Sequence, residues 1–255
     1  MRGFVDARRA VLRATGADAR PLLQDLVTND LDRLSEGGLV YAALLTPQGK
    51  YLFDFFVAAE GAGLLIDVAA DQAAALAQRL AMYRLRREMD IAATDLRVTL
   101  LWGEGAPPGG AMRDPRDEAL GWRVFGDAPH EPASFEDYEA LRISRSVPET
   151  GAELIPNDSY ILEHGFERLN GVDFRKGCYV GQEVTARMKH KTELKKGLAR
   201  VAVEGAAEPG DAILAADGKP AGVLRSVQDG EGLAHLRFDR ADGAMTAGSA
   251  EVRRI

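Results

Sequence analysis

One segment of the sequence combines residue types that are suited to thiol chemistry. The chain has 255 residues and a single cysteine, Cys178, which lies within the string Lys176-Gly177-Cys178-Tyr179-Val180-Gly181-Gln182-Glu183. The two glycines allow a sharp turn or a close approach of the backbone. Basic residues surround the cysteine in the sequence, and cations favour the reactive thiolate form if the sulfur is exposed. They are Arg175, Lys176, Arg187, Lys189, His190 and Lys191. A buried structural cysteine is the alternative that composition leaves open.

The sequence lacks the residue patterns of a metal centre and of a dinucleotide-binding loop. One cysteine cannot supply the thiolate set of an iron–sulfur cluster, so we predict no protein-held metal. Any cluster would have to be shared with another chain or completed by a small thiol. The glycine-rich stretch 103–110 has neither the register nor the following helix of a dinucleotide-binding loop. Metal-ligand spacing is absent among the four histidines, His130, His164, His190 and His235.

The bulk composition restricts the classes of partner. A net charge of −7 argues against direct binding of nucleic acid or of an anionic membrane by the molecule as a whole. No apolar run approaches the ~20 residues that span a bilayer. The first residues lack the apolar segment of a signal peptide, and a single cysteine fits a reducing compartment. We therefore expect a cytoplasmic protein without a membrane partner.

The elements that must position the cysteine are indicated by hydrophobic periodicity and turn residues. Leucines at helical spacing follow Asp18, which is a favoured N-cap type. Apolar runs at 39–45 and 51–57 flank a Pro/Gly loop and predict a hairpin. Further strands are expected at 64–68, 97–102 and 121–125, with helices from about residue 71 and after the capping-box pattern at 134–137. Without a βαβ rhythm, this mixture predicts an α+β fold.

The last sixty residues have a different pattern of apolar and turn residues. Short apolar runs alternate there with the turn pairs Asp217-Gly218, Asp229-Gly230 and Asp242-Gly243. This pattern predicts a small antiparallel barrel or sandwich. We place the boundary at 195–197, which gives a region 1–195 and a C-terminal β-barrel 196–255.

The string 176–183 resembles the signature of the YgfZ family, Lys-Gly-Cys-Tyr-x-Gly-Gln-Glu, and reproduces it without departure. Residues 170–172, 185–187 and His190 extend the similarity toward the mitochondrial-type iron–sulfur assembly factors and their bacterial relatives. Thr28-Asn29-Asp30 and the turn at 48–50 also have counterparts. A wider resemblance is to the T-protein of glycine cleavage, an aminomethyltransferase. It implies a ring of subdomains around a tetrahydrofolate pocket, with two intertwined subdomains in 1–195.

This resemblance also implies which residues form the site. Asp54 stands where the T-protein has an acidic residue at its folate site. Strand alternation would put Leu52, Asp54 and Phe56 on one face, where pterin amino and amide groups would pair with the carboxylate. A water-facing edge or an arginine partner is the alternative. Glu163 lies near the family's pterin-binding glutamate, and Glu167 competes with it.

The signature residues complete the expected site. Cys178 is the expected reactive thiol, and the resemblance implies folate contacts for Lys176, Tyr179 and Arg187. The remaining signature residues are Gly177, Gly181, Gln182 and Glu183. The basic residues of 175–196 would capture the glutamyl tail of folate or a polyanion such as tRNA, or else form a solvated face.

Three functions follow. The first, which we favour, is a folate-dependent accessory factor in iron–sulfur cluster assembly that supports client enzymes, and through them tRNA modification, without catalytic turnover of its own. Its partners would be folate and iron–sulfur assembly or client proteins. The second is a tetrahydrofolate-dependent aminomethyl or methyl transferase, in which Asp54 would orient the folate amine or act as a general acid. The third is a factor that binds tRNA directly.

Overall fold

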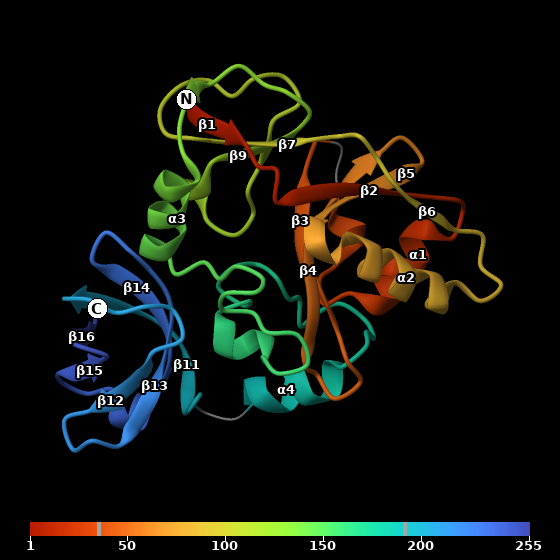
Figure 1. The fold of residues 1–255 in the computed structure, drawn as a ribbon. Coiled ribbons are helices and arrows are strands. Elements are labelled where there is room, and N and C mark those ends of the chain that lie inside the picture. Colours follow the sequence, from red (N-terminus) through yellow and green to blue (C-terminus); the bar gives the residue numbers. More distant parts are fainter. Residues whose placement is uncertain (35–36, 191–192) are drawn as a thin grey trace.

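The computed structural model describes residues 1–34, 37–190 and 193–255. Figure 1 shows two sheets and a barrel arranged around a central segment, residues 145–181, whose one assigned helix is short. The helix α4 (Gln182–His190) follows this segment, and η4 (Ile161–His164) lies within it. The arrangement confirms the predicted α+β class.

The first sheet carries the predicted hairpin. Its strand order is β3-β4-β5-β2-β6, and every neighbouring pair is antiparallel. The helices α1 (Ala19–Leu26) and α2 (Ala73–Arg84) pack their leucines against one face of it. The strands are β2 (Arg9–Thr15), β3 (Leu39–Leu45), β4 (Tyr51–Glu60), β5 (Gly63–Ala69) and β6 (Asp90–Ala93), and the short helices nearby are η1 (Leu31–Arg33) and η2 (Ala70–Gln72).

The second sheet begins with a strand that periodicity did not reveal, β1 (Arg2–Val5). Its order is β10-β1-β7-β9-β8, and the helix α3 (Phe135–Ser144) follows it. The predicted capping box is confirmed, since Ser134 and Asp137 exchange side-chain and backbone hydrogen bonds. The remaining elements are β7 (Val98–Trp102), β8 (Met112–Arg113), η3 (Glu118–Leu120), β9 (Trp122–Phe125) and β10 (Glu131–Pro132).

The C-terminal residues form the expected barrel. Six antiparallel strands close in the order β11-β14-β13-β12-β15-β16, around a core of small and branched side chains. Full closure leaves this sheet without an open edge. Its elements are β11 (Lys196–Glu204), β12 (Ala212–Ala215), β13 (Pro220–Gln228), β14 (Glu231–Arg237), η5 (Phe238–Arg240), β15 (Met245–Ala247) and β16 (Ala250–Arg254).

Two local expectations were wrong. Asp18 stands at the N-cap of α1 but makes no capping bond, because its carboxylate accepts the backbone N–H of Glu88 at 2.7 Å. In β4 the register shifts at Leu52, so Leu44 pairs with Phe53 and Leu45 with Tyr51. This β-bulge removes Leu52 from the face of Asp54 and puts Tyr51 there instead.

Candidate functional site

The two signature glycines differ in what they contact. Gly181 has φ +84°, and a Cβ built there would lie 2.6 Å from the carbonyl oxygen of Thr46. Gly49, in the turn of the β3–β4 hairpin, has φ +74°, and a Cβ built there would lie 2.8 Å from Val184 and 3.3 Å from the carbonyl oxygen of Gly181 in the signature. By contrast, nothing surrounds a Cβ at Gly177 within 4 Å. Gly181 therefore docks the signature loop onto the hairpin, while Gly177 lies in the open.

Lys176 is held by the scaffold. Its Nζ donates to the carbonyl oxygens of Gln24 and Val27, each at 2.6 Å, and of Asn29 at 3.1 Å. These carbonyls lie at and beyond the C-terminal end of α1, where a cation is favoured. Burial lowers the pKa of Lys176 to about 8, against the opposing effect of Asp30 and other nearby carboxylates. All three ammonium protons have partners, so this geometry ties the signature loop to α1; the expected folate contact of Lys176 stays a prediction.

Cys178 is exposed, although its neighbour Tyr179 is buried in the core. The side-chain oxygen of Gln182 accepts the backbone N–H of Tyr179 at 3.1 Å, which fixes the loop where α4 begins. The alternative of a buried structural cysteine is therefore wrong. The sulfur stands on a loop that is anchored by Lys176 before it and by Tyr179 and Gly181 after it.

The basic residues near the cysteine do not form one cationic cluster. Arg187 is exposed on α4 and pairs with Glu183 at 3.1 Å, one helical turn away. Lys189 pairs with Glu167. Arg175 lines the central cavity described below. Lys191 lies outside the described residues.

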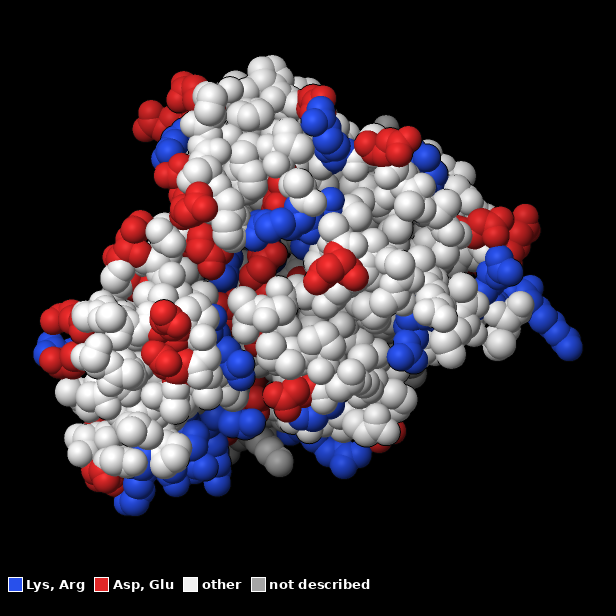
Figure 2. Space-filling model, viewed as in Figure 1, with Lys and Arg blue, Asp and Glu red and all other residues white. Residues whose placement is uncertain are grey.

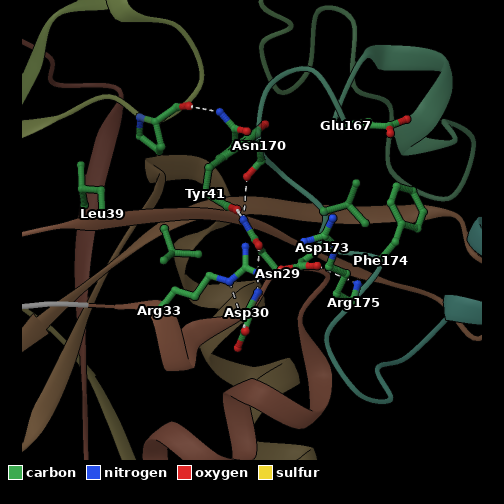
Figure 3. Close-up of a pocket in the computed structure, with 13 residues that line it drawn as sticks. Asn29, Asp30, Arg33, Leu39, Tyr41, Glu167, Asn170, Asp173, Phe174 and Arg175 are labelled. Atoms are coloured by element: carbon green, nitrogen blue, oxygen red, sulfur yellow. Dashed lines mark hydrogen bonds and ion pairs between the residues drawn. The ribbon is translucent and has the colours of Figure 1, made fainter.

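The central cavity has a volume of about 550 Å³ and lies beside the signature loop. Figure 3 shows Asn29 in its middle, with Arg33 and Asp30 on one side and Phe174 and Arg175 on the other. Asn29 is fixed by donating to the carbonyl oxygens of Tyr41 at 2.8 Å and Asn170 at 2.6 Å. The other lining residues are Leu39, Val40, Tyr41, Pro115, Glu167, Asn170, Val172 and Asp173.

The side chains that line this cavity include both carboxylates and guanidinium groups. Arg33 pairs with Asp173 at 2.5 Å and with Asp30 at 3.4 Å. Arg175 is exposed at the rim, with no described carboxylate at ion-pair distance. The cavity therefore offers carboxylates, amides and guanidinium groups beside the aromatic ring of Phe174.

Asp54 is buried, 3% exposed, and is bound by neutral hydroxyls. Tyr41 donates to Oδ2 at 2.9 Å, Tyr51 donates to Oδ1 at 2.7 Å, and Thr150 also donates to Oδ1. Both expected alternatives, a water-facing edge and an arginine partner, are wrong. Asp54 does not line the central cavity, but Tyr41 connects the two because its ring lines the cavity and its hydroxyl binds Asp54.

Glu163 lies in a separate, smaller site between η4 and the barrel. Its carboxylate is 9% exposed and accepts His235 Nε2 at 3.2 Å and Lys196 Nζ at 3.4 Å. The cavity there holds only about 30 Å³ and is also lined by His164 and Arg225. Of the two competing glutamates, Glu167 is therefore the one that lines the large cavity.

Several residues of these sites were missed in the sequence. Tyr41 lines the cavity, Thr150 binds Asp54, and His235 holds Glu163. Asn29 was identified only as part of a family match, and Lys196 only as one of the basic residues of 175–196, so the cavity role of the first and the pairing of the second with Glu163 were also missed. Thr150 lies 96 residues from Asp54 along the chain, and His235 lies 72 residues from Glu163. No local pattern reports such distant pairs. The helix α4 was also missed, although the i,i+4 pair of Glu183 and Arg187 was a usable signal.

Within residues 1–34, 37–190 and 193–255, no group of three or more His, Cys, Asp or Glu side chains is placed to hold a metal ion. Among the helices of the same ranges, none has the length and apolar character needed to cross a membrane.

Comparison with known proteins identifies the family. Residues 195–255 match the family described as CAF17, C-terminal beta-barrel domain. The mitochondrial iron–sulfur cluster assembly factor IBA57 of Mus musculus is 32% identical over 97% of this chain and 80% of the relative. The same factor of Homo sapiens is 31% identical with the same coverage.

A solved structure agrees at the level of the fold. The glycine cleavage system aminomethyltransferase T from Bartonella henselae matches with a TM-score of 0.79 and 14% identity, over 100% of this chain and 84% of that chain. At this identity the likeness shows the fold alone, and it confirms the predicted T-protein-like architecture. The sequence relatives go further, and they are consistent with the YgfZ resemblance: this chain belongs to the family of the iron–sulfur cluster assembly factor IBA57.

Proposed function

We propose that this chain is an accessory factor in iron–sulfur cluster assembly, in which Cys178 is the acting thiol and a reduced folate occupies the central cavity. The observation that carries the proposal is the contrast within the signature. Lys176, Tyr179 and Gly181 are locked into the scaffold, while the sulfur between them is exposed. A thiol presented in this way can reach a cluster or a partner protein without unfolding of the loop.

The test of the thiol is Cys178→Ser. Because the side chain is exposed, we expect the free energy of unfolding to change by less than about 0.5 kcal/mol. In cells that lack the native protein, the variant should fail to restore the activity of cluster-dependent enzymes. Glu183→Gln changes an exposed signature side chain of the same region and serves as the matched control, with full support expected. Full support by Cys178→Ser would refute the role of the thiol.

The residues of the central cavity fit a folate. A volume of about 550 Å³ is within the usual range for small-molecule sites, about 300–1,000 Å³. Asp30 and Glu167 can accept hydrogen bonds from a pterin, and Arg175 can bind the carboxylates of a glutamyl tail. The Glu163 site does not fit a pterin, since about 30 Å³ is room for a water molecule.

Folate binding is tested by titration of the purified chain with tetrahydrofolate. Arg175→Ala should weaken binding about ten-fold, because it removes a rim cation, and ten-fold corresponds to about 1.4 kcal/mol. Arg187→Ala is the matched comparison, since Arg187 is exposed but does not line the cavity. Unchanged affinity in Arg187→Ala would support the cavity as the site, whereas a loss there alone would support the sequence-based assignment of Arg187.

The two other functions have less support. A transferase that uses Asp54 on its substrate needs this carboxylate to reach the substrate, but Asp54 is buried and does not line the central cavity. Direct tRNA binding needs several available cations, but Arg187 and Lys189 each pair with a glutamate, and Arg175 is the member of this group that lines the central cavity. An indirect effect on tRNA modification through client enzymes remains part of our proposal, as does the cytoplasmic location expected from the sequence.

A further inference from the structure

The C-terminal end of α2 carries the two most exposed large apolar side chains of the described residues. Leu85 is 88% exposed and Met82 is 64% exposed, whereas the next three range from 37% to 53%. Met82 lies in the last turn of α2 and Leu85 is the C-cap residue, so both exposed side chains stand at the same end of this helix. The outward face of α2 leads up to them with exposed Ala74, Ala75, Gln78 and Ala81. Apolar side chains on a solvent face indicate an interaction site when they gather in one place.

The backbone of Leu85 is strained. It has φ +47° and ψ −104° at the C-cap of α2, where a glycine would adopt a positive φ without steric cost. A residue with a Cβ is strained in such a conformation and keeps it only when the surrounding structure imposes it. Burial does not compensate, because the side chain is almost wholly in solvent. A leucine at this position therefore contributes little to folding, and its side chain is available for a contact outside the molecule.

Arginines surround this apolar surface. A hollow of about 610 Å³ is lined by Tyr83, Arg84, Leu85, Arg86 and Arg87. Arg84 is held by Asp90 at 2.9 Å and Arg87 by Asp25 at 2.8 Å. Of the carboxylates that the structure describes, none is at ion-pair distance from Arg86. The connection that follows α2 lies at the right-hand edge in Figure 1, and basic side chains project from that edge in Figure 2.

We propose that the surface Met82–Arg87 docks an acidic segment of a partner protein. A large apolar side chain of that segment would contact Leu85 and Met82, and its carboxylates would meet Arg86 and the exposed edges of Arg84 and Arg87. Charge complementarity argues for an acidic occupant, because three arginines line the hollow beside Leu85 and Arg86 has no described carboxylate at ion-pair distance. A net charge of −7 disfavours the broad contact of an anionic membrane more than the contact of a short segment with this one surface. This docking surface shares no residue with the central cavity or with the signature loop.

The experiment is a selection from displayed random twelve-residue peptides on the full chain. The recovered peptides should be acidic and contain at least one large apolar residue. They should bind Arg86→Glu and Leu85→Gly at least ten-fold more weakly than the native chain, and binding should weaken as salt is raised. Leu85→Gly should also raise the Tm, since glycine removes the strain while the contact is lost. A structural role of Leu85 would lower the Tm instead.

Controls keep the outcome decisive. Arg113→Glu reverses an exposed charge on β8, and Leu214→Ser removes an exposed apolar side chain from the barrel, so neither should change peptide binding. Peptides without an acidic bias, or equal binding by Arg86→Glu, would overturn the proposal. So would binding of the chain to vesicles of phosphatidylcholine and phosphatidylserine that Leu85→Gly abolishes, if no acidic peptide is recovered.

Discussion

Asp54 and Glu163 are both buried carboxylates that join segments distant in the sequence, yet their partners differ in kind. Asp54 is bound by three hydroxyls. Burial raises the pKa of Tyr41 and Tyr51 well above the usual value, and the negative charge of Asp54 adds to this effect. Both donors therefore keep their protons. Glu163 is bound by Lys196 and His235, beside the ring of His164.

The Glu163 site contains groups that titrate. Burial opposes the charge of Glu163, but the hydrogen bond from His235 and the charge of Lys196 outweigh it and lower its pKa. Burial lowers the pKa of His164 to about 4. These groups lie where the barrel meets the central segment, so the attachment of the barrel should respond to pH through them. The hydroxyl donors around Asp54 should not respond in the same range.

The largest effect is expected from Asp54→Ala. The substitution leaves the hydroxyls of Tyr41, Tyr51 and Thr150 buried without their common acceptor, and we expect a loss of about 3–5 kcal/mol in the free energy of unfolding. Urea denaturation at pH 7 measures it. Tyr41→Phe, which removes one donor, should cost about 1 kcal/mol. A loss below 1 kcal/mol for Asp54→Ala would show that the cluster does not hold the sheet to the central segment.

The partners of Asp54 could be predicted only in part from the sequence. Alternation correctly placed Asp54 and Phe56 on one face, but it could not reveal the bulge at Leu52 that brings Tyr51 beside them. A bulge shifts all later side chains by one position, and its presence depends on packing rather than on local propensity. The contact between Thr150 and Asp54 was still harder to predict, because Thr150 belongs to the central segment, 96 residues away along the chain.

Other parts were predictable because the signal was local. The hairpin and the capping box follow from residues within one turn or loop, and both are confirmed. The barrel was predicted from Asp-Gly turns between short apolar runs. The docking of Gly181 against Gly49 was not predicted, since the need for glycine arises from a close approach between two distant loops. The resemblance to the family identified the loop, but which of its residues are anchored and that its cysteine is exposed follow only from the structure.

An intermediate effect is expected from pH, through His164. Its folded-state pKa of about 4 lies below the unfolded value of about 6.5, so its contribution is fully present above pH 6.5 and is lost as the pH falls toward 4. We expect the chain to lose about 2–3 kcal/mol across this range from this residue alone. Urea denaturation between pH 7 and pH 4 measures the slope. His164→Gln, which cannot gain a proton, should flatten it; an unchanged slope would place the titrating groups elsewhere.

The smallest effect is expected from Glu163→Gln. The amide oxygen can still accept from His235 and Lys196, but the charge that attracts Lys196 is lost. Because Lys196 is half exposed, solvent screens this pair, and we expect a loss of about 1 kcal/mol. The loss should be confined to the barrel, since Glu163 holds β11 and β14 and makes no contact with Asp54. Amide hydrogen exchange distinguishes the regions: faster exchange in β11 and β14, with unchanged exchange in β3 and β4, is the expected result. Uniform acceleration in all four strands would mean that the barrel and the first sheet unfold as one unit, and the two buried carboxylates would then stabilise the same cooperative structure rather than separate parts of it.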